Sequence, residues 1–223
     1  MDEDTFCLLD RGGAGIFIFT STGKLVNQIN YFGQAPHEFT DITAFTIDPH
    51  LNQICIWDVG SRSIKKYTYK GEFVKTYRTD VLIRELATFQ NEINLFILPF
   101  YSKECPYSIW IEDLNNQVVK DFDYPKPKDD QFEFVNTYCN KEANSSYYYD
   151  RNYDQLLYIT SDTLQTVYSI ELTQRLSNDL RIKDPSSFKW ENFAMMWNFS
   201  ISPKYLLMNY YYYEQEKPYK WVL

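Results

Sequence analysis

Apolar and polar residues alternate in short runs along most of the chain, and turn-forming residues separate the runs. The clearest example is the stretch "TAFTID" (43–48), "QICIWD" (53–58), "SIKKYTY" (63–69) and "EFVKTY" (72–77). Alternation with a period of two residues is typical of half-buried β-strands, whose successive side chains point to opposite faces. The pattern therefore predicts four consecutive strands in this part of the chain.

The same arrangement occurs earlier in the sequence. Residues 7–29 align without a gap with residues 55–77, and seven positions are identical. One identical pair is Gly23 and Gly71, which stand where a tight hairpin needs a positive φ that glycine adopts without steric cost. The repeat predicts two copies of one β-sheet unit.

More divergent copies follow. A third matches the second at an offset of 45 residues, with Asn116 in place of Gly71, and a fourth and a fifth are predicted between residues 132 and 213. Helical periodicity is nearly absent, apart from one possible turn at "DVLIREL" (80–86). The predicted units lie near residues 3–30, 38–80, 85–123, 130–173 and 188–223.

Repeats of about 40–50 residues with four short strands each are typical of a β-propeller. We therefore expect an all-β fold, a single β-propeller domain of four-stranded antiparallel blades over residues 1–223, with four to five blades of a six-bladed type. At 48 residues per blade, the 223 residues do not fit a closed ring. The sequence thus predicts a chain truncated at both ends.

Aromatic residues make up 18% of the chain, including 20 tyrosines and 16 phenylalanines. Their large rings suit the packing of one blade against the next. The tyrosine runs at 147–149 and 210–213 are interpreted first as strand faces, with a stacking platform for sugars or bases as the alternative.

Charge and hydropathy narrow the classes of partner. There are 22 basic and 30 acidic residues and the net charge is −8, so the sequence does not favour nucleic-acid binding. The longest apolar runs, such as "INLFILPF" (93–100), are too short for a transmembrane helix.

Four cysteines are present: Cys7, Cys55, Cys105 and Cys139. Their spacing does not match a zinc site. Cys7 and Cys55 occupy equivalent positions in the two clear copies, which favours buried thiols, with a disulfide framework as the alternative.

The sequence offers no catalytic or cofactor-binding motif. His37-Glu38 begins like a zinc-metalloprotease helix, but residue 41 is aspartate rather than histidine, and the other histidine, His50, is in a predicted turn. We therefore assign no catalytic, cofactor or metal-binding residues.

Asp10 and Asp58 recur at strand ends. They are predicted to cap the turns that follow, with a channel-lining or calcium-binding role as the alternative. Arg11 and Arg62 lie in the same loops and are the candidate ligand-binding residues, for an anionic or hydroxyl-rich ligand. The alternative is that both are ordinary surface arginines.

The stretch from residue 31 to 77 resembles the NHL-like six-bladed β-propeller proteins of gut and related bacteria, many of which are exported lipoproteins. Gly33, Pro36, Glu38 and Phe39 match the family's linker, while Ala35 and His37 replace two of its glycines. Asp58, Ile64, Tyr67 and Gly71 match the strands that follow. The resemblance implies an exported protein, periplasmic or on the cell surface, with a lipid anchor possible in the full-length protein.

We therefore predict a non-enzymatic binding or interaction protein that recognises a glycan, a peptide or a partner protein, without a cofactor. The alternative is a six-bladed propeller enzyme, such as a calcium-dependent lactonase or a lyase.

Overall fold

The strands of this computed structural model follow the predicted alternation. In β4 (Ile42–Asp48) buried and half-buried residues alternate along the strand. The structure describes residues 5–10, 15–48, 50–79, 83, 85–89, 93–97, 109–113, 117–125, 139–142, 144–150, 153–171, 194–202, 204–214 and 217–222. Every regular element in these ranges is a β-strand.

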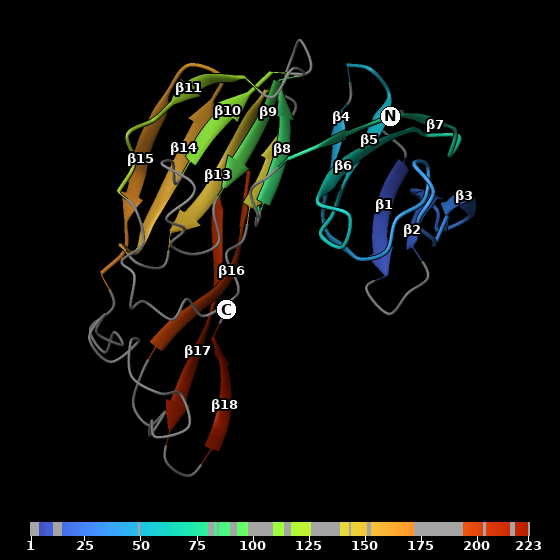
Figure 1. Cartoon of the computed structure of the whole chain (residues 1–223). Helices are drawn as coiled ribbons and strands as arrows, with labels where there is room; N and C mark the ends of the chain where they lie inside the picture. The colour runs from blue at the N-terminus through green and yellow to red at the C-terminus, as the bar shows by residue number, and fades with distance from the viewer. Residues whose placement is uncertain are drawn as a thin grey trace. The chain divides into compact units, whose positions relative to one another are not determined.

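The chain forms two compact units, residues 1–98 with 109–124, and residues 99–108 with 125–223. The first unit contains three antiparallel sheets, which Figure 1 shows in blue to green. Their strands are β1 (Thr5–Asp10), β2 (Gly15–Thr20) and β3 (Leu25–Ile29); then β4, β5 (Gln53–Asp58), β6 (Ser63–Thr68) and β7 (Phe73–Arg78); then β8 (Glu85–Phe89), β9 (Ile93–Ile97), β10 (Ile109–Glu112) and β11 (Val118–Asp121).

The second unit contains two antiparallel sheets, shown in yellow to red in Figure 1. Their strands are β12 (Cys139–Glu142), β13 (Ser145–Asp150), β14 (Gln155–Thr160) and β15 (Leu164–Ser169); then β16 (Ala194–Ile201), β17 (Leu206–Glu214) and β18 (Lys217–Val222). In every sheet the strands that follow one another in sequence are neighbours. This up-and-down order is that of a propeller blade.

The sequence repeat is also a structural repeat. β1, β2 and β3 correspond to β5, β6 and β7, and a β-bulge lies between Ile18 and Phe19 in one copy and between Lys66 and Tyr67 in the other. Gly23 and Gly71 have φ of 84° and 79°, which confirms the predicted hairpin geometry. The two copies therefore share strand register as well as sequence.

A hydrophobic core joins the first two sheets. Ile16 and Ile18 of β2 pack with Ile54 and Ile56 of β5, and all four are buried. Burying each such side chain contributes about 1.5–3 kcal/mol. β4 also lies against β8 of the third sheet. As a result β5 and β6 are buried on both faces, as central strands of stacked blades must be.

The structure bears on three further sequence predictions. Cys55 is a buried thiol, as predicted, Cys7 is a half-buried one, and neither forms a disulfide. Residues 147–149 lie in β13 and residues 210–213 in β17, as predicted for strand faces. The possible helical turn at 80–86 lies mostly outside the described residues, and its last two residues, Glu85 and Leu86, begin strand β8, where Leu86 is fully buried. Asn116 and Cys105 lie outside the described residues.

Candidate functional site

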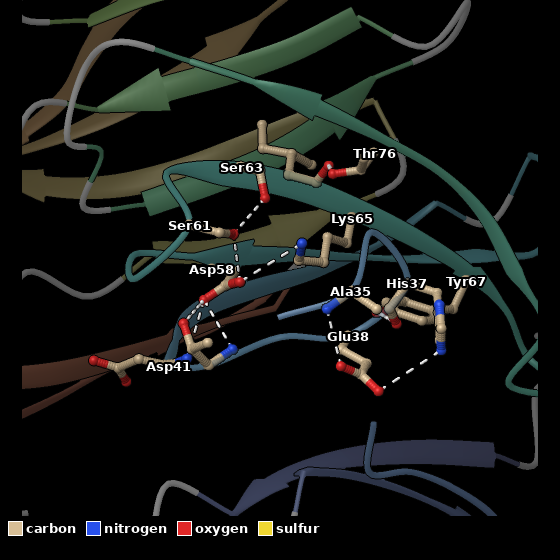
Figure 2. Close-up of polar contacts among 12 residues, drawn as sticks. Ala35, His37, Glu38, Asp41, Asp58, Ser61, Ser63, Lys65, Tyr67 and Thr76 are labelled. Carbon is tan, nitrogen blue, oxygen red and sulfur yellow. Dashed lines mark hydrogen bonds and ion pairs between the residues drawn. The ribbon is translucent and has the colours of Figure 1, made fainter. Parts of the chain in front are cut away.

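A buried carboxylate organises the end of the second sheet where β5 turns into β6. Asp58, the last residue of β5, is fully buried. Its Oδ1 accepts hydrogen bonds from the Thr40 amide (3.2 Å), the Thr40 hydroxyl (2.9 Å) and the Asp41 amide (3.0 Å). Figure 2 shows the carboxylate between the β5–β6 turn and the segment that leads into β4. Asp58 therefore joins two parts of the chain 17–18 residues apart.

The other carboxylate oxygen faces β6. Asp58 Oδ2 accepts a 2.5 Å hydrogen bond from the Ser61 hydroxyl, which lies 2.6 Å from the Ser63 hydroxyl. The Lys65 ammonium lies 3.7 Å from the same oxygen, and the Lys65 side chain is only 4% exposed. Ser63 and Lys65 are on one face of β6, because alternate residues of a strand share a face. The result is a buried ion pair with a short chain of hydroxyl groups beside it (Figure 2).

The environment shifts the ionisation of both partners. Burial by itself would raise the pKa of Asp58, but the hydrogen bonds from Ser61, Asp41 and Thr40 outweigh it and hold this pKa below its ordinary value. Burial lowers the pKa of Lys65, although the Asp58 carboxylate opposes this effect. A carboxylate with a lowered pKa is a weak base, so this arrangement is suited to holding the two chain segments together.

The β5–β6 turn, residues 59–62, is tightly held. The Val59 amide donates to the Asp41 carbonyl (3.0 Å), and the Thr79 amide donates to the Arg62 carbonyl (3.1 Å). A Cβ atom on Gly60 would clash with the Thr40 hydroxyl group that donates to Asp58, so a larger residue here would displace Thr40. Arg62 itself has a left-handed backbone with φ of 49° and an exposed side chain. The turn is a rigid support that presents an arginine to solvent.

The candidate residues from the sequence are placed as follows. Arg62 lies at the turn anchored by Asp58, and Arg11 lies outside the described residues. Asp58 does contact the following turn through Ser61, but most of its hydrogen bonds go to the preceding segment. Asp10, its equivalent in the first copy, is exposed. Two positions that are identical in sequence thus occupy different environments.

Sequence reasoning did not find Lys65 or Thr40. Nothing in the spacing relates Lys65 to Asp58, because the two residues meet only through the β5–β6 register, in which Asp58 pairs with Ser63. The one available signal was the polar Thr40-Asp41 pair just before β4, which could supply donors to a strand-end carboxylate.

His37 and Glu38, a neighbouring histidine and carboxylate, do not form part of a metal site in the described ranges. His37 Nε2 lies 3.9 Å from Glu38 Oε1, and no group of three or more His, Cys, Asp and Glu residues in those ranges is placed to hold a metal ion. No helix there is long and apolar enough to cross a membrane.

The ionisation of Asp58 leads to a prediction about pH. Because its pKa is lowered in the folded state, its contribution to stability is present above the unfolded value of about 3.9 and is lost as the pH falls through the folded value. We expect the difference in unfolding free energy between the wild type and Asp58→Asn to be constant from pH 7 to 5 and to shrink below about pH 4. Urea denaturation of both proteins at several pH values measures this difference. A difference that is unchanged at pH 3 would contradict the role given to the ionised carboxylate.

Comparisons with known proteins give a family and a fold. The family described as "Domain of unknown function (DUF4934)" matches residues 1–222. No curated protein matches the sequence. A solved structure from Bacteroides fragilis, named "Putative exported protein", is similar with a TM-score of 0.68 and 15% identity over 97% of this chain and 68% of its own.

Two other solved structures have the same fold. A member of the DUF4221 family from Bacteroides vulgatus has a TM-score of 0.57 and 15% identity, over 92% of this chain and 65% of its own. Virginiamycin B lyase from Staphylococcus aureus has a TM-score of 0.52 and 10% identity, over 100% of this chain and 67% of its own. The chain thus spans about two thirds of these proteins, and at such low identity the likeness shows the fold alone. Together with the sheets, it shows that the chain is built of β-propeller blades, which confirms the predicted fold class.

Proposed function

The chain belongs to the DUF4934 family, and from this premise we propose that it is a non-enzymatic binding propeller of an exported bacterial protein. The observation that carries the proposal is the rigid β5–β6 turn, where the buried Asp58 network fixes a loop that exposes Arg62. Binding residues concentrate on loops held by rigid scaffolds. The partner is a glycan, a peptide or a protein with an anionic or hydroxyl-rich group that Arg62 contacts.

Export and finer classification are part of this proposal. The name of the Bacteroides fragilis structure supports export of that protein, and the same fold supports extending this property to the present chain. The linker residues Gly33, Pro36, Glu38 and Phe39 support membership of the NHL-like, six-bladed group, in which a lipid anchor on the full-length protein is common.

The binding role of Arg62 is testable with an array of anionic and neutral oligosaccharides and acidic peptides. For the ligands that bind, Arg62→Ala is expected to weaken affinity about tenfold, because a hydrogen bond to a charged group contributes about 1.5 kcal/mol or more. Lys70→Ala is the matched control, since Lys70 is an exposed cation in the turn at the other end of β6.

Equal loss of binding in both variants would show a nonspecific charge effect and would contradict a site at Arg62. The enzyme alternative is tested on the same preparation by metal analysis and by lactonase and lyase assays. Stoichiometric calcium together with turnover would contradict the non-enzymatic proposal.

A further inference from the structure

Four ring-bearing side chains lie on the surface of the first unit, over the 31–39 segment and the start of β7. They are Tyr31, Phe32, His37 and Phe73, and we call them the aromatic surface. Tyr31, Phe32 and Phe73 are 39%, 43% and 37% exposed, and the His37 side chain is 53% exposed. Single exposed apolar side chains are ordinary on a protein surface, whereas neighbouring exposed apolar side chains are a candidate interaction site.

The rings form a connected arrangement around a buried tyrosine. The centroid of His37 lies 6.3 Å from those of Tyr31 and Phe73, both edge-on. Tyr67, which is fully buried, lies 6.1 Å from Tyr31 and 5.8 Å from Phe73. These four contacts close a cycle of rings, three of them exposed. Phe32 joins it through the buried Phe39, whose centroid lies 4.7 Å away.

The segment that carries these rings is held in place by hydrogen bonds. The Phe39 amide donates to the Tyr31 carbonyl (2.8 Å), and the Tyr67 hydroxyl donates to the His37 carbonyl (2.8 Å). Figure 2 shows His37, Glu38 and Tyr67 together beside the strands. A surface that is already ordered loses little conformational entropy on binding.

A carboxylate lies beside the aromatic surface. Glu38 is next to His37, and its side chain is 30% exposed. One of its oxygens, Oε2, accepts a hydrogen bond from the Ala35 amide, while Oε1 lies 3.9 Å from the His37 ring. Ring faces carry the negative part of the aromatic quadrupole, so rings and carboxylate together attract a cation. The net charge of −8 adds to this attraction at longer range.

We propose that the aromatic surface binds an arginine side chain of a partner polypeptide. Arginine fits better than lysine because its guanidinium is planar, is less strongly hydrated, stacks on rings and can donate to the Glu38 carboxylate at the same time. The inference rests on the proposed binding function and adds a second contact surface, distinct from the turn that carries Arg62.

The test uses nuclear magnetic resonance on the isotope-labelled chain and the probe peptide acetyl-Gly-Arg-Gly-Arg-Gly-amide. A second peptide with citrulline in place of each arginine keeps the shape and removes the charge. We expect the arginine peptide to shift resonances of residues 31–39 and of Phe73, and the citrulline peptide to bind at least about fivefold more weakly. Tyr31→Ala and Glu38→Gln are each expected to weaken binding about threefold.

The matched control is Tyr205→Ala, because Tyr205 is a 71% exposed tyrosine in the other unit and its loss should leave binding unchanged. Phe73→Leu provides a second test of the rings if Tyr31→Ala does not fold. Equal binding of the two peptides, or shifts confined to other residues, would overturn the inference. A neutral oligosaccharide that binds the aromatic surface more tightly than the arginine peptide would also overturn it. If one of these results overturns the inference but ligand binding through Arg62 is retained, the proposed binding function still holds.

Discussion

Replacing Asp58 with alanine is expected to lower the free energy of unfolding by about 3–5 kcal/mol, the loss typical of breaking a buried ion pair from one side. The substitution leaves the Lys65 ammonium, 3.7 Å from Asp58 Oδ2, buried without its counter-charge. It also removes the acceptor for the Thr40 and Asp41 amides, so that the segment leading into β4 loses its anchor. Chemical denaturation followed by circular dichroism measures the change.

The repeat supplies the control for this experiment. Asp10 is the equivalent residue in the first copy, but it is exposed, so Asp10→Ala should cost about 0.5 kcal/mol or less. The double variant Asp58→Ala/Lys65→Met should recover part of the lost stability, because it removes the unpaired charge along with its partner. Similar losses for Asp10→Ala and Asp58→Ala would contradict a special role for the buried network.

Replacing Lys66 with methionine is expected to raise the free energy of unfolding by about 1–3 kcal/mol. Lys66 is fully buried, and its Nζ has no hydrogen-bond partner in the part of the chain that the structure describes. The neighbouring Lys65, by contrast, forms an ion pair with Asp58. Methionine has a similar length and no charge, so it removes the desolvation cost while it keeps most of the packing.

Lys70→Met is the control, because Lys70 is exposed and the change should stay within about 0.5 kcal/mol. Thermal and chemical unfolding of the two variants give the comparison. A loss of stability in Lys66→Met would mean that the ammonium is compensated in the folded protein, and the stabilising effect predicted here would be wrong.

The alternating pattern predicted the strands of the two clear copies because every second side chain of a strand points to the same face. It did not predict the burial of β6, because the two adjacent lysines, Lys65 and Lys66, are polar on both faces of the strand and would ordinarily indicate exposure. Both faces of this strand are covered, so both lysines are buried. β18 lies inside the predicted fifth unit (188–223), but no strand was predicted for it. Pro218, which cannot donate a backbone hydrogen bond, disfavours a strand in so short a segment.

The candidate site was only partly predictable for a similar reason. The position of Asp58 at a strand end indicated a capping role, and Arg62 was recognisable as a loop residue. The partners Thr40 and Lys65 depend on which chain segments meet in space, and alternation within a strand carries no such information. The aromatic surface likewise forms from the 31–39 segment and β7, which are separated in sequence by the three strands β4, β5 and β6.

The hydrogen bonds of residues 31–41 determine where new chain termini can be introduced without disrupting a blade. This segment connects the first sheet to the second. Its hydrogen bonds to Tyr67, Asp58 and Val59 all go to the second sheet and its β5–β6 turn. It is therefore a structural part of the second blade. New termini for a permuted or shortened chain should be placed at Asn30, because this leaves the hydrogen bonds of residues 31–41 intact. A break after Phe39 would separate residues 31–39 from the sheet to which they are bonded.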